Sequence, residues 1–413
     1  MDTLFLFSAA LNLDAPWRVE RVEFLPSKEK PSMKELHIYV GFARGGKFHC
    51  PEEGCVESMT AYDTSERTWR HLDFFQYKTY LHAALPRIRC KEHGTKTVSV
   101  PWARPNCGFT LLFEGWLVEL SKHLPVVAIA RMVDEHGTRL WKILHHYVEA
   151  ARSRQDLSAV DAIGMDETSR KGHNYITIAV DLKRRNVLYV TEGKDHETVG
   201  CFVEDFRAHG GSTESVGVIT CDVSLGFRKG ILENFPEAHT IIDKFHVVKH
   251  CNEAVDKVRK EEAKTNELLR RTKYIWLKNE KNLTENQREK KTALCRKHLR
   301  TARAYCMRIA LQEIYETCMD KEHADERLRR LCSWMMHSRL DPMKEFAWLV
   351  RRHSEEILNY FKYKYINAVL EGMNSVIQNL KCRARGFRNM EYFKTMIYLV
   401  CGKLDLDVVV AQP

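Results

Sequence analysis

The sequence predicts a multidomain protein in which small N-terminal modules precede an α/β domain that a helical segment interrupts. Three observations support this fold class. Two close pairs of metal-ligating side chains lie within the first 100 residues, a helical hairpin pattern follows them, and strands alternating with helices come next. The 413 residues also exceed what a single hydrophobic core usually holds, so several domains are expected.

The composition is typical of a folded protein without a membrane-spanning segment. Hydrophobic residues make up 44% of the chain, and the longest apolar runs fall short of the roughly 18 residues that cross a bilayer. Residues 1–13 are apolar but lack a basic start, which predicts a buried first segment and not a signal peptide. The 13 cysteines, an odd number spread over the chain, favour free thiols in a reducing compartment, so we expect a cytoplasmic protein.

Residues 1–100 contain two pairs of soft metal ligands, 34 residues apart: Cys50 with Cys55, and Cys90 with His93. Such pairs can meet in a tetrahedral Cys3His zinc site, which would be structural because protein ligands fill all four positions. Partial alternation across residues 69–90 predicts the strands that carry the pairs. His49 is an alternative fourth ligand, and unrelated buried thiols with a surface histidine are the alternative to a metal site.

Residues 101–155 predict a helix-turn-helix domain. Apolar residues recur at helical spacing across 109–123, and further helices are expected at 126–134 and at 138–151, the last with Thr138 as its N-cap. Short helices joined by a Gly-containing turn are the helix-turn-helix pattern, and the position directly after the predicted zinc site favours a DNA-reading module. The last helix, which carries Arg139 and Lys142, would then enter a major groove. An ordinary helical hairpin is the alternative.

Residues 156–250 have an α/β pattern. The expected elements are, in order, strands at 159–165, 175–180 and 186–191, a helix at 196–208, a strand at 216–221, a helix at 227–235 and a strand at 240–242. Short polar connections predict an antiparallel meander for the first three strands, and the apolar strands linked by a helix should be parallel. This order is typical of a ribonuclease H-like fold, in which the first and fourth strands are neighbours.

The first and fourth strands each stop at an aspartate, Asp166 and Asp222. Side chains beyond the ends of neighbouring strands lie close together, and a pair of carboxylates suits Mg²⁺ or Mn²⁺. Glu167 alternates to the opposite face of its strand and is not expected in the site. An aspartate that merely begins a turn is the alternative interpretation of each residue taken alone.

Residues 251–362 predict an all-helical insertion, and residues 363–413 return to the α/β domain. The stretch 251–310 contains 17 Lys/Arg against 8 Asp/Glu, much of the chain's net charge of +10, which suits either DNA backbone or a solvated helix surface. An amphipathic helix at 366–380 carries Glu371 on its polar side, where a glutamate is usually just solvated. A basic cluster that could hold phosphate follows: Lys381, Arg383, Arg385 and Arg388.

The chain resembles the DDE transposases of bacterial insertion sequences, specifically the ISL3 group, over almost its full length. Besides the Cys/His pairs, the segments that carry the resemblance are Trp69-Arg-His-Leu-Asp73, Pro86-Arg-Ile-Arg-Cys90, Gly164-Met-Asp-Glu-Thr168, Lys171-Gly-His173, Thr220-Cys-Asp222, Asp243-Lys-Phe-His-Val-Val-Lys249, Asn367-Ala-Val-Leu-Glu-Gly-Met-Asn374 and Arg385-Gly-Phe-Arg-Asn389. The ordered set is specific, although no single motif is decisive. One departure is that His93 stands where a fourth cysteine is common.

The resemblance implies a zinc finger, a helix-turn-helix domain and a ribonuclease H-like catalytic domain interrupted by an all-helical insertion. Asp166, Asp222 and Glu371 would hold two divalent ions for cleavage at the transposon ends and joining of 3′-hydroxyls to target DNA. His246 would support the site, with a buried structural histidine as its alternative. The implied partners are double-stranded DNA and a second copy of the chain, with a homodimer or a larger assembly on DNA. A non-catalytic DNA-binding relative and a nuclease without strand transfer are the alternative functions.

Overall fold

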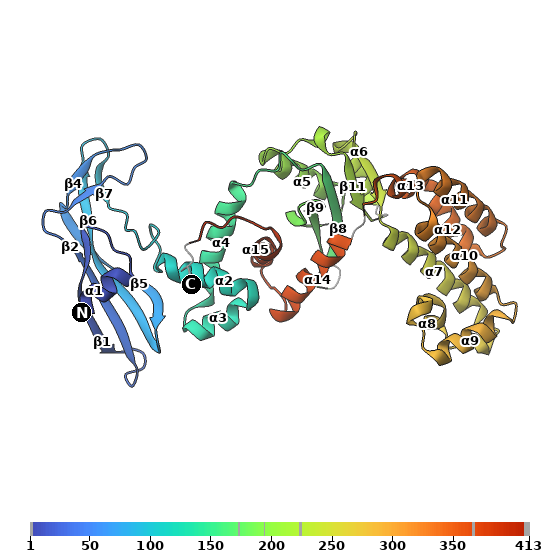
Figure 1. Cartoon of the computed structure of the whole chain (residues 1–413), viewed down its shortest axis with the longest axis horizontal. Helices are drawn as coiled ribbons and strands as arrows, with labels where there is room; N and C mark the ends of the chain where they lie inside the picture. Colours follow the sequence, from blue (N-terminus) through green and yellow to red (C-terminus); the bar gives the residue numbers. More distant parts are fainter. Residues whose placement is uncertain (1–2, 172–173, 194, 223–224, 366–367, 409–413) are drawn as a thin grey trace. The chain divides into compact units, whose positions relative to one another are not determined.

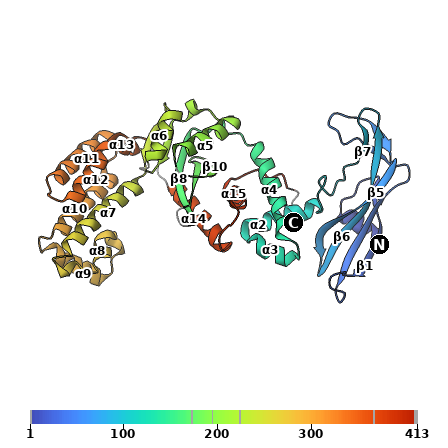
Figure 2. The same ribbon diagram turned by 180° about the vertical axis from the view of Figure 1, so that it is seen from behind.

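The computed structural model describes residues 3–171, 174–193, 195–222, 225–365 and 368–408. The chain divides into two compact units, one formed by Met1–Ala151 with Asp405–Pro413 and the other by Arg152–Leu404. Figures 1 and 2 show the elements of each unit from opposite sides. Within the described residues no helix combines the length and apolar character needed to span a membrane.

A five-stranded sheet forms the N-terminal part of the first unit. Its strands are β1 (Trp17–Pro26), β2 (Lys34–Phe42), β6 (Tyr77–Cys90) and β5 (Asp63–Phe74) in this spatial order, with β7 (Gly94–Thr97) paired to β6. The short strands β3 (Lys47–His49) and β4 (Ser58–Thr60) pair with each other. The strands predicted across residues 69–90 are confirmed as β5 and β6, whereas β1 and β2 were not among the predicted elements.

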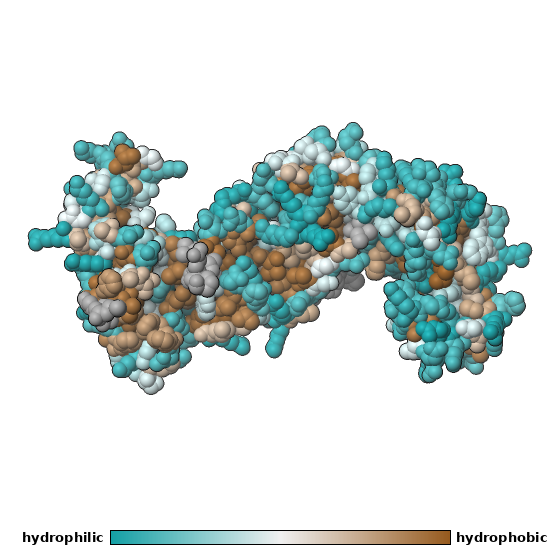
Figure 3. All heavy atoms as spheres, viewed as in Figure 1, coloured by the Kyte–Doolittle hydropathy of each residue, from teal (hydrophilic) through white to brown (hydrophobic). Residues whose placement is uncertain are grey.

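The N-terminal helix α1 (Thr3–Ala10) is only partly buried, which corrects the expectation of a buried segment at residues 1–13. Phe7 packs into the core beneath the sheet, and its ring centroid lies 5.4 Å from that of Phe74. Phe5 and Leu6 keep 65% and 52% of their surface exposed. A short helix packed on a sheet can bury only one face, so the remaining apolar residues of α1 face outward. Figure 3 shows apolar residues gathered at this end of the sheet.

Three helices follow the sheet: α2 (Leu111–His123), α3 (Val126–Val133) and α4 (Gly137–Ser153). Thr110 caps α2, because its side chain accepts a hydrogen bond from the N–H of Phe113. The expected N-cap role of Thr138 is wrong, since α4 already begins at Gly137. The turn between α3 and α4 contains Asp134 in the left-handed conformation, with a φ of 52°. The helices predicted from periodicity are therefore present: α2 begins two residues later than predicted, α3 at the predicted residue and α4 one residue earlier.

The second unit contains a mixed sheet. Its strands are β8 (Ala162–Lys171), β9 (Asn174–Asp181), β10 (Asn186–Glu192), β11 (Val218–Cys221) and β12 (His239–Ile242), and their spatial order is β10-β9-β8-β11-β12. The first three strands pair antiparallel, whereas β11 is parallel to both β8 and β12. The predicted meander and the predicted pairing of the first and fourth strands are confirmed. The predicted strand end at Asp166 is wrong, because pairing with β9 continues past this residue to Lys171.

Helices cover both faces of this sheet. On one face, α5 (His196–Ala208) and α6 (Leu225–Asn234) share a core with strand residues such as Met165. On the other face, α14 (Ala368–Arg383) and α15 (Met390–Cys401) share a second core with residues such as Ile178. Figures 1 and 2 both show α14 beside β8. A Cβ atom at Gly164 would lie 2.6 Å from Leu370 Cδ1, so this glycine allows α14 to approach the strand that carries Asp166.

Between β12 and α14 the described elements are helical. They are α7 (Lys244–Glu262), α8 (Lys273–Leu277), α9 (Glu285–Cys295), α10 (Arg300–Thr317), α11 (Lys321–Met336), α12 (Asp341–Arg352) and α13 (Ser354–Tyr363), with two short 3-10 turns. One cluster of buried side chains joins them, with Trp276, Met307 and Leu340 fully buried. Figure 3 shows a mostly hydrophilic surface here. Not all of the positive charge of residues 251–310 lies on the surface, because the side chain of Lys291 is buried and donates a hydrogen bond of 2.6 Å to Glu280.

Candidate functional site

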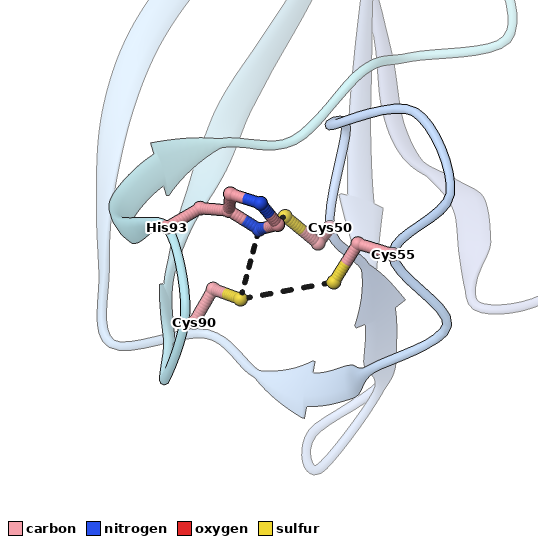
Figure 4. A group of neighbouring side chains, drawn as sticks. All are labelled: Cys50, Cys55, Cys90 and His93. Carbon is pink, nitrogen blue, oxygen red and sulfur yellow. Dashed lines mark hydrogen bonds between the residues drawn. The ribbon is translucent and has the colours of Figure 1, made fainter.

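The four predicted zinc ligands come together in the first unit (Figure 4). Cys50 and Cys55 lie on the loop between β3 and β4, Cys90 ends β6, and His93 lies in the turn before β7. Cys55 Sγ lies 3.8 Å from Cys90 Sγ, and His93 Nδ1 lies 3.7 Å from Cys50 Sγ and 3.5 Å from Cys90 Sγ. A tetrahedral zinc ion with Zn–S bonds of about 2.3 Å separates its sulfur ligands by roughly 3.8 Å. The ligand set and its spacing therefore fit zinc.

The surroundings of the four ligands favour thiolate character at Cys90. The backbone N–H of His93 is the main cause of a lowered pKa at the Cys90 thiol, although burial acts against it. Glu57 contacts the same cysteine, with its Oε2 3.5 Å from Cys90 Sγ and within reach of the N–H of Lys91. His49, the alternative fourth ligand, is exposed and does not belong to the ligand group.

A buried carboxylate joins the helices of the helix-turn-helix domain. Glu114 of α2 is fully buried and accepts two hydrogen bonds of 2.7 Å from Arg104 and one of 2.8 Å from the hydroxyl of Tyr147 in α4. The thiol of Cys107 also donates to it at 2.7 Å. Burial, together with Glu114, raises the pKa of Cys107 to about 11, so this thiol stays protonated. These bonds fix α2 against α4.

Arg139 and Lys142, the two α4 residues predicted to contact DNA, differ in their surroundings. Arg139 forms an ion pair with Glu135, and its guanidinium lies over the ring of Phe109, 4.3 Å from the centroid. Glu135 also faces the buried Arg70 of β5, with 3.9 Å between Oε1 and Nε. Lys142 is exposed on the helix. Both side chains are exposed, and Arg139 differs from Lys142 in its contacts with Glu135 and Phe109.

Asp166 lies on β8, and Asp222 directly follows the neighbouring parallel strand β11. The paired residues of β11 and β8 end at Thr220 and Gly164, and this register continued further puts Asp222 level with Asp166. Their charges interact, because Asp222 is one of the groups that raise the pKa of Asp166. The two carboxylates thus lie where the parallel pairing of the strands stops, which is where open α/β sheets place their ligands.

Both oxygens of Asp166 are held by hydrogen bonds. Oδ1 accepts from the backbone N–H of Glu167 at 2.8 Å, and Oδ2 accepts from Asn374 Nδ2 of α14 at 2.7 Å. Burial raises the pKa of this carboxyl above its usual value, although Glu167, His246 and Asn374 act in the opposite direction. A buried carboxylate beside a second one is a position that a divalent cation would stabilise.

His246, on the first turn of α7, lies against Asp222. Its Nδ1 is 2.8 Å from Asp222 Oδ1, an ion-pair contact, although this nitrogen makes no hydrogen bond of standard geometry with the described residues. Burial lowers the pKa of His246, but Asp222, Asp166 and Asp243 outweigh burial and raise it above the usual value. The imidazole is therefore disposed to carry a proton next to Asp222.

Glu371 is exposed near the start of α14. Within the described part of the chain the only group of three or more potential ligands is the Cys/His group, so Asp166, Asp222 and Glu371 do not lie within direct ligand distance of one another. Sequence reasoning missed Asn374, which shares the helix face of Glu371. A polar residue on an amphipathic helix gives no sign that it faces a strand instead of solvent.

The basic cluster lies at the end of α14. Lys381 and Arg383 belong to its last turn, and Arg385, with a φ of 55°, and Arg388 follow in the connection to α15. The last three are exposed. Cations at a helix C-terminus are also favoured by the helix dipole, so this position alone does not require a ligand. The motif residues His173 and Asn367 lie outside the described residues.

Comparison with known proteins agrees with this arrangement. A family model of ISL3 DDE transposases, described as "Transposase", matches residues 163–397, more than half of the chain. Models described as "Helix-turn-helix domain of transposase family ISL3" and "zinc-finger of transposase IS204/IS1001/IS1096/IS1165" match residues 98–148 and 47–93.

Two relatives are similar over nearly their whole length. The transposase for insertion sequence element IS1557 of Mycobacterium tuberculosis is 26% identical over 94% of this chain and 93% of its own. The transposase for insertion sequence element IS1001 of Bordetella parapertussis is 26% identical over 91% of this chain and 93% of its own. The zinc-finger, helix-turn-helix and transposase segments also follow one another in the predicted order. The chain belongs to the ISL3 family of DDE transposases.

Proposed function

We propose that the protein binds the terminal inverted repeats of an insertion sequence, cleaves DNA at these ends and joins the 3′-hydroxyls to target DNA. The observation that carries this proposal is that Asp166 of β8 and Asp222, which directly follows β11, belong to adjacent parallel strand segments, with His246 against Asp222. The strand order β10-β9-β8-β11-β12 supports a ribonuclease H-like catalytic core. The helices α7–α13 would then be an insertion into that core.

The donor set at this site fits two Mg²⁺ or Mn²⁺ ions, because it consists of carboxylate oxygens. Asp166, Asp222 and Glu371 would hold the ions, and Glu371 would complete the set by a movement of its side chain or of α14. When bound, such ions activate water or a 3′-hydroxyl and stabilise the leaving oxygen. Asp166 is oriented by the backbone N–H of Glu167 and by Asn374, and His246 would position Asp222 through its contact with Oδ1.

The domains would divide this work. We infer a zinc-finger module at 1–100, a helix-turn-helix domain at 101–155, a catalytic core at 156–250 and 363–413, and an all-helical insertion at 251–362. Zinc would be structural, since the protein supplies four ligands to it. Lys142 on α4 would contact the ends, whereas Arg383, Arg385 and Arg388 would hold DNA phosphates near the core. Pairing two ends calls for at least a homodimer on DNA.

A strand-transfer assay tests the proposal. Purified protein is mixed with a labelled end oligonucleotide, target plasmid and Mg²⁺ or Mn²⁺, and both nicked and joined products are measured. Asp166→Asn, Asp222→Asn and Glu371→Gln should each reduce cleavage by orders of magnitude, while Glu167→Gln retains more activity. Cleavage without joining would indicate a nuclease, and binding without cleavage under any divalent ion would indicate a DNA-binding protein.

A further inference from the structure

Helix α14 turns polar side chains toward strand β8. Asn374 Nδ2 donates to Asp166 Oδ2 at 2.7 Å, and one turn further Gln378 Nε2 donates to Thr168 Oγ1 at 2.7 Å. Glu371 precedes Asn374 by three positions, so it projects from the same side of the helix. The polar side of this amphipathic helix therefore meets a catalytic strand and not only solvent.

Asn374 has one polar atom whose purpose the fold does not explain. Its Oδ1 is buried and has no hydrogen-bond partner among the residues that the structure describes. A buried acceptor without a donor destabilises the fold, so such an atom usually has a ligand or a functional reason. Here the atom belongs to the amide that also holds Asp166, within the site proposed for divalent ions.

We propose that Asn374 is a positioning residue of the catalytic site with two tasks. Its N–H group locks the rotamer of Asp166, and its Oδ1 accepts a hydrogen bond from an O–H group that enters the site, either water or the DNA 3′-hydroxyl. This inference rests on the proposed function. An amide suits both tasks because it donates and accepts hydrogen bonds without adding a further negative charge to a site that already contains carboxylates.

The competing interpretation is that Asn374 only fastens α14 to the sheet, as Gln378 does through Thr168. The two interpretations differ in what the residue changes. A fastening role affects the free energy of unfolding, whereas a positioning role affects divalent-ion affinity and turnover. Residues that orient a metal ligand typically change metal affinity or activity by about 10- to 100-fold when removed.

The first experiment measures Mn²⁺ binding to the full-length, DNA-free protein by titration calorimetry. Asn374→Ala and the nearly isosteric Asn374→Leu should both weaken binding at the carboxylate site by about 10- to 100-fold. Asn379→Ala is the matched control, because Asn379 is exposed on the same helix, and Gln378→Ala reports fastening alone. Both controls should keep the affinity of the wild type. Equal affinities in all five proteins would overturn the proposal.

The second experiment measures end cleavage at saturating Mn²⁺ and varied DNA. Loss of the O–H acceptor should lower kcat in both Asn374 variants while KM for end DNA and the melting temperature stay near those of the wild type. If the variants lose only melting temperature, Asn374 merely fastens the helix. Asp166→Asn serves as the reference. If Asp166→Asn cleaves DNA as well as the wild type, the proposed function itself is wrong. If Asp166→Asn is inactive but the Asn374 variants are fully active, only the inference about Asn374 is wrong.

Discussion

At the scale of single residues, the structure separates side chains that look equivalent in the sequence. Glu114 and Glu119 both lie on α2, but the first is fully buried among three donors and the second forms an exposed ion pair with Lys122. A buried ion pair that loses one partner leaves the other charge without compensation, whereas an exposed pair contributes little. The two residues therefore make a matched pair for mutation.

Glu114→Ala should destabilise the N-terminal unit by about 3–5 kcal/mol, because Arg104 would remain largely buried without its carboxylate. Glu119→Ala should cost less than about 1 kcal/mol. Urea unfolding followed by tryptophan fluorescence measures both changes. Equal effects of the two substitutions would show that the buried network does not hold the helices together.

His71 makes the stability of the N-terminal unit depend on pH. Burial, helped by the charge of Arg70, lowers the pKa of His71 to about 4, and its Nδ1 lies 2.8 Å from the hydroxyl of Thr110, the residue that caps α2. In the unfolded chain the imidazole titrates near its ordinary value of about 6.5. As the pH falls, the unfolded state therefore binds this proton before the folded state does. The contribution of neutral His71 to the free energy of unfolding is fully present above about pH 6.5 and is lost between about pH 6.5 and 4.

The loss expected from His71 is on the order of 3 kcal/mol. His71→Gln should flatten the dependence of the unfolding free energy on pH in this window. The comparison must be the difference between wild type and variant, since the zinc ligands also bind protons at low pH. Parallel curves for the two proteins would mean that His71 titrates normally in the folded state.

At the scale of secondary-structure elements, α4 carries two exposed cations, of which Arg139 has partners within the protein. Lys142→Ala should weaken end-DNA binding and reduce the log–log salt slope by about one unit, as expected for one lost phosphate contact. Arg139→Ala should mainly lower stability, because Arg139 is engaged by Glu135 and Phe109. Fluorescence anisotropy at several salt concentrations measures the slope, and a larger loss of affinity in Arg139→Ala without a loss of stability would reverse the assignment.

The basic cluster at the end of α14 is the second case in which the contribution of charge to DNA binding can be tested. The triple variant Arg383→Gln, Arg385→Gln and Arg388→Gln should flatten the salt dependence and weaken binding to every DNA sequence alike, since phosphate contacts carry no base information. Binding to end DNA and to scrambled DNA is compared in the same titration. An unchanged slope would show that these arginines only complement the helix dipole and remain solvated.

At the scale of the whole molecule, the division into two compact units predicts separate responses to metal removal. Cys55→Ser or a zinc chelator should unfold the N-terminal module and abolish specific end binding, because metal binding and folding of such modules are coupled. The second unit should keep its own unfolding transition in calorimetry. A variant without zinc that still binds end DNA normally would contradict a structural role for the metal.

Several features of this protein were determined by the sequence alone. The zinc ligands could be named because soft ligands in close pairs are a local pattern. The order of strands and helices in 156–250 followed from local periodicity, and the neighbouring position of Asp166 and Asp222 followed from the strand order that this periodicity implied. Local patterns of this kind do not depend on how the rest of the chain packs.

Only the tertiary structure decided which polar side chains face one another. Asn374 looked like one more solvated residue of an amphipathic helix, and its contact with Asp166 exists because Gly164 lets α14 approach β8. Arg139 stays a predicted DNA contact, but only the structure shows that its exposed side chain also contacts Glu135 and Phe109. The physical reason is the same in both cases. Periodicity defines the polar side of a helix, but what that side meets depends on contacts between residues far apart in the chain.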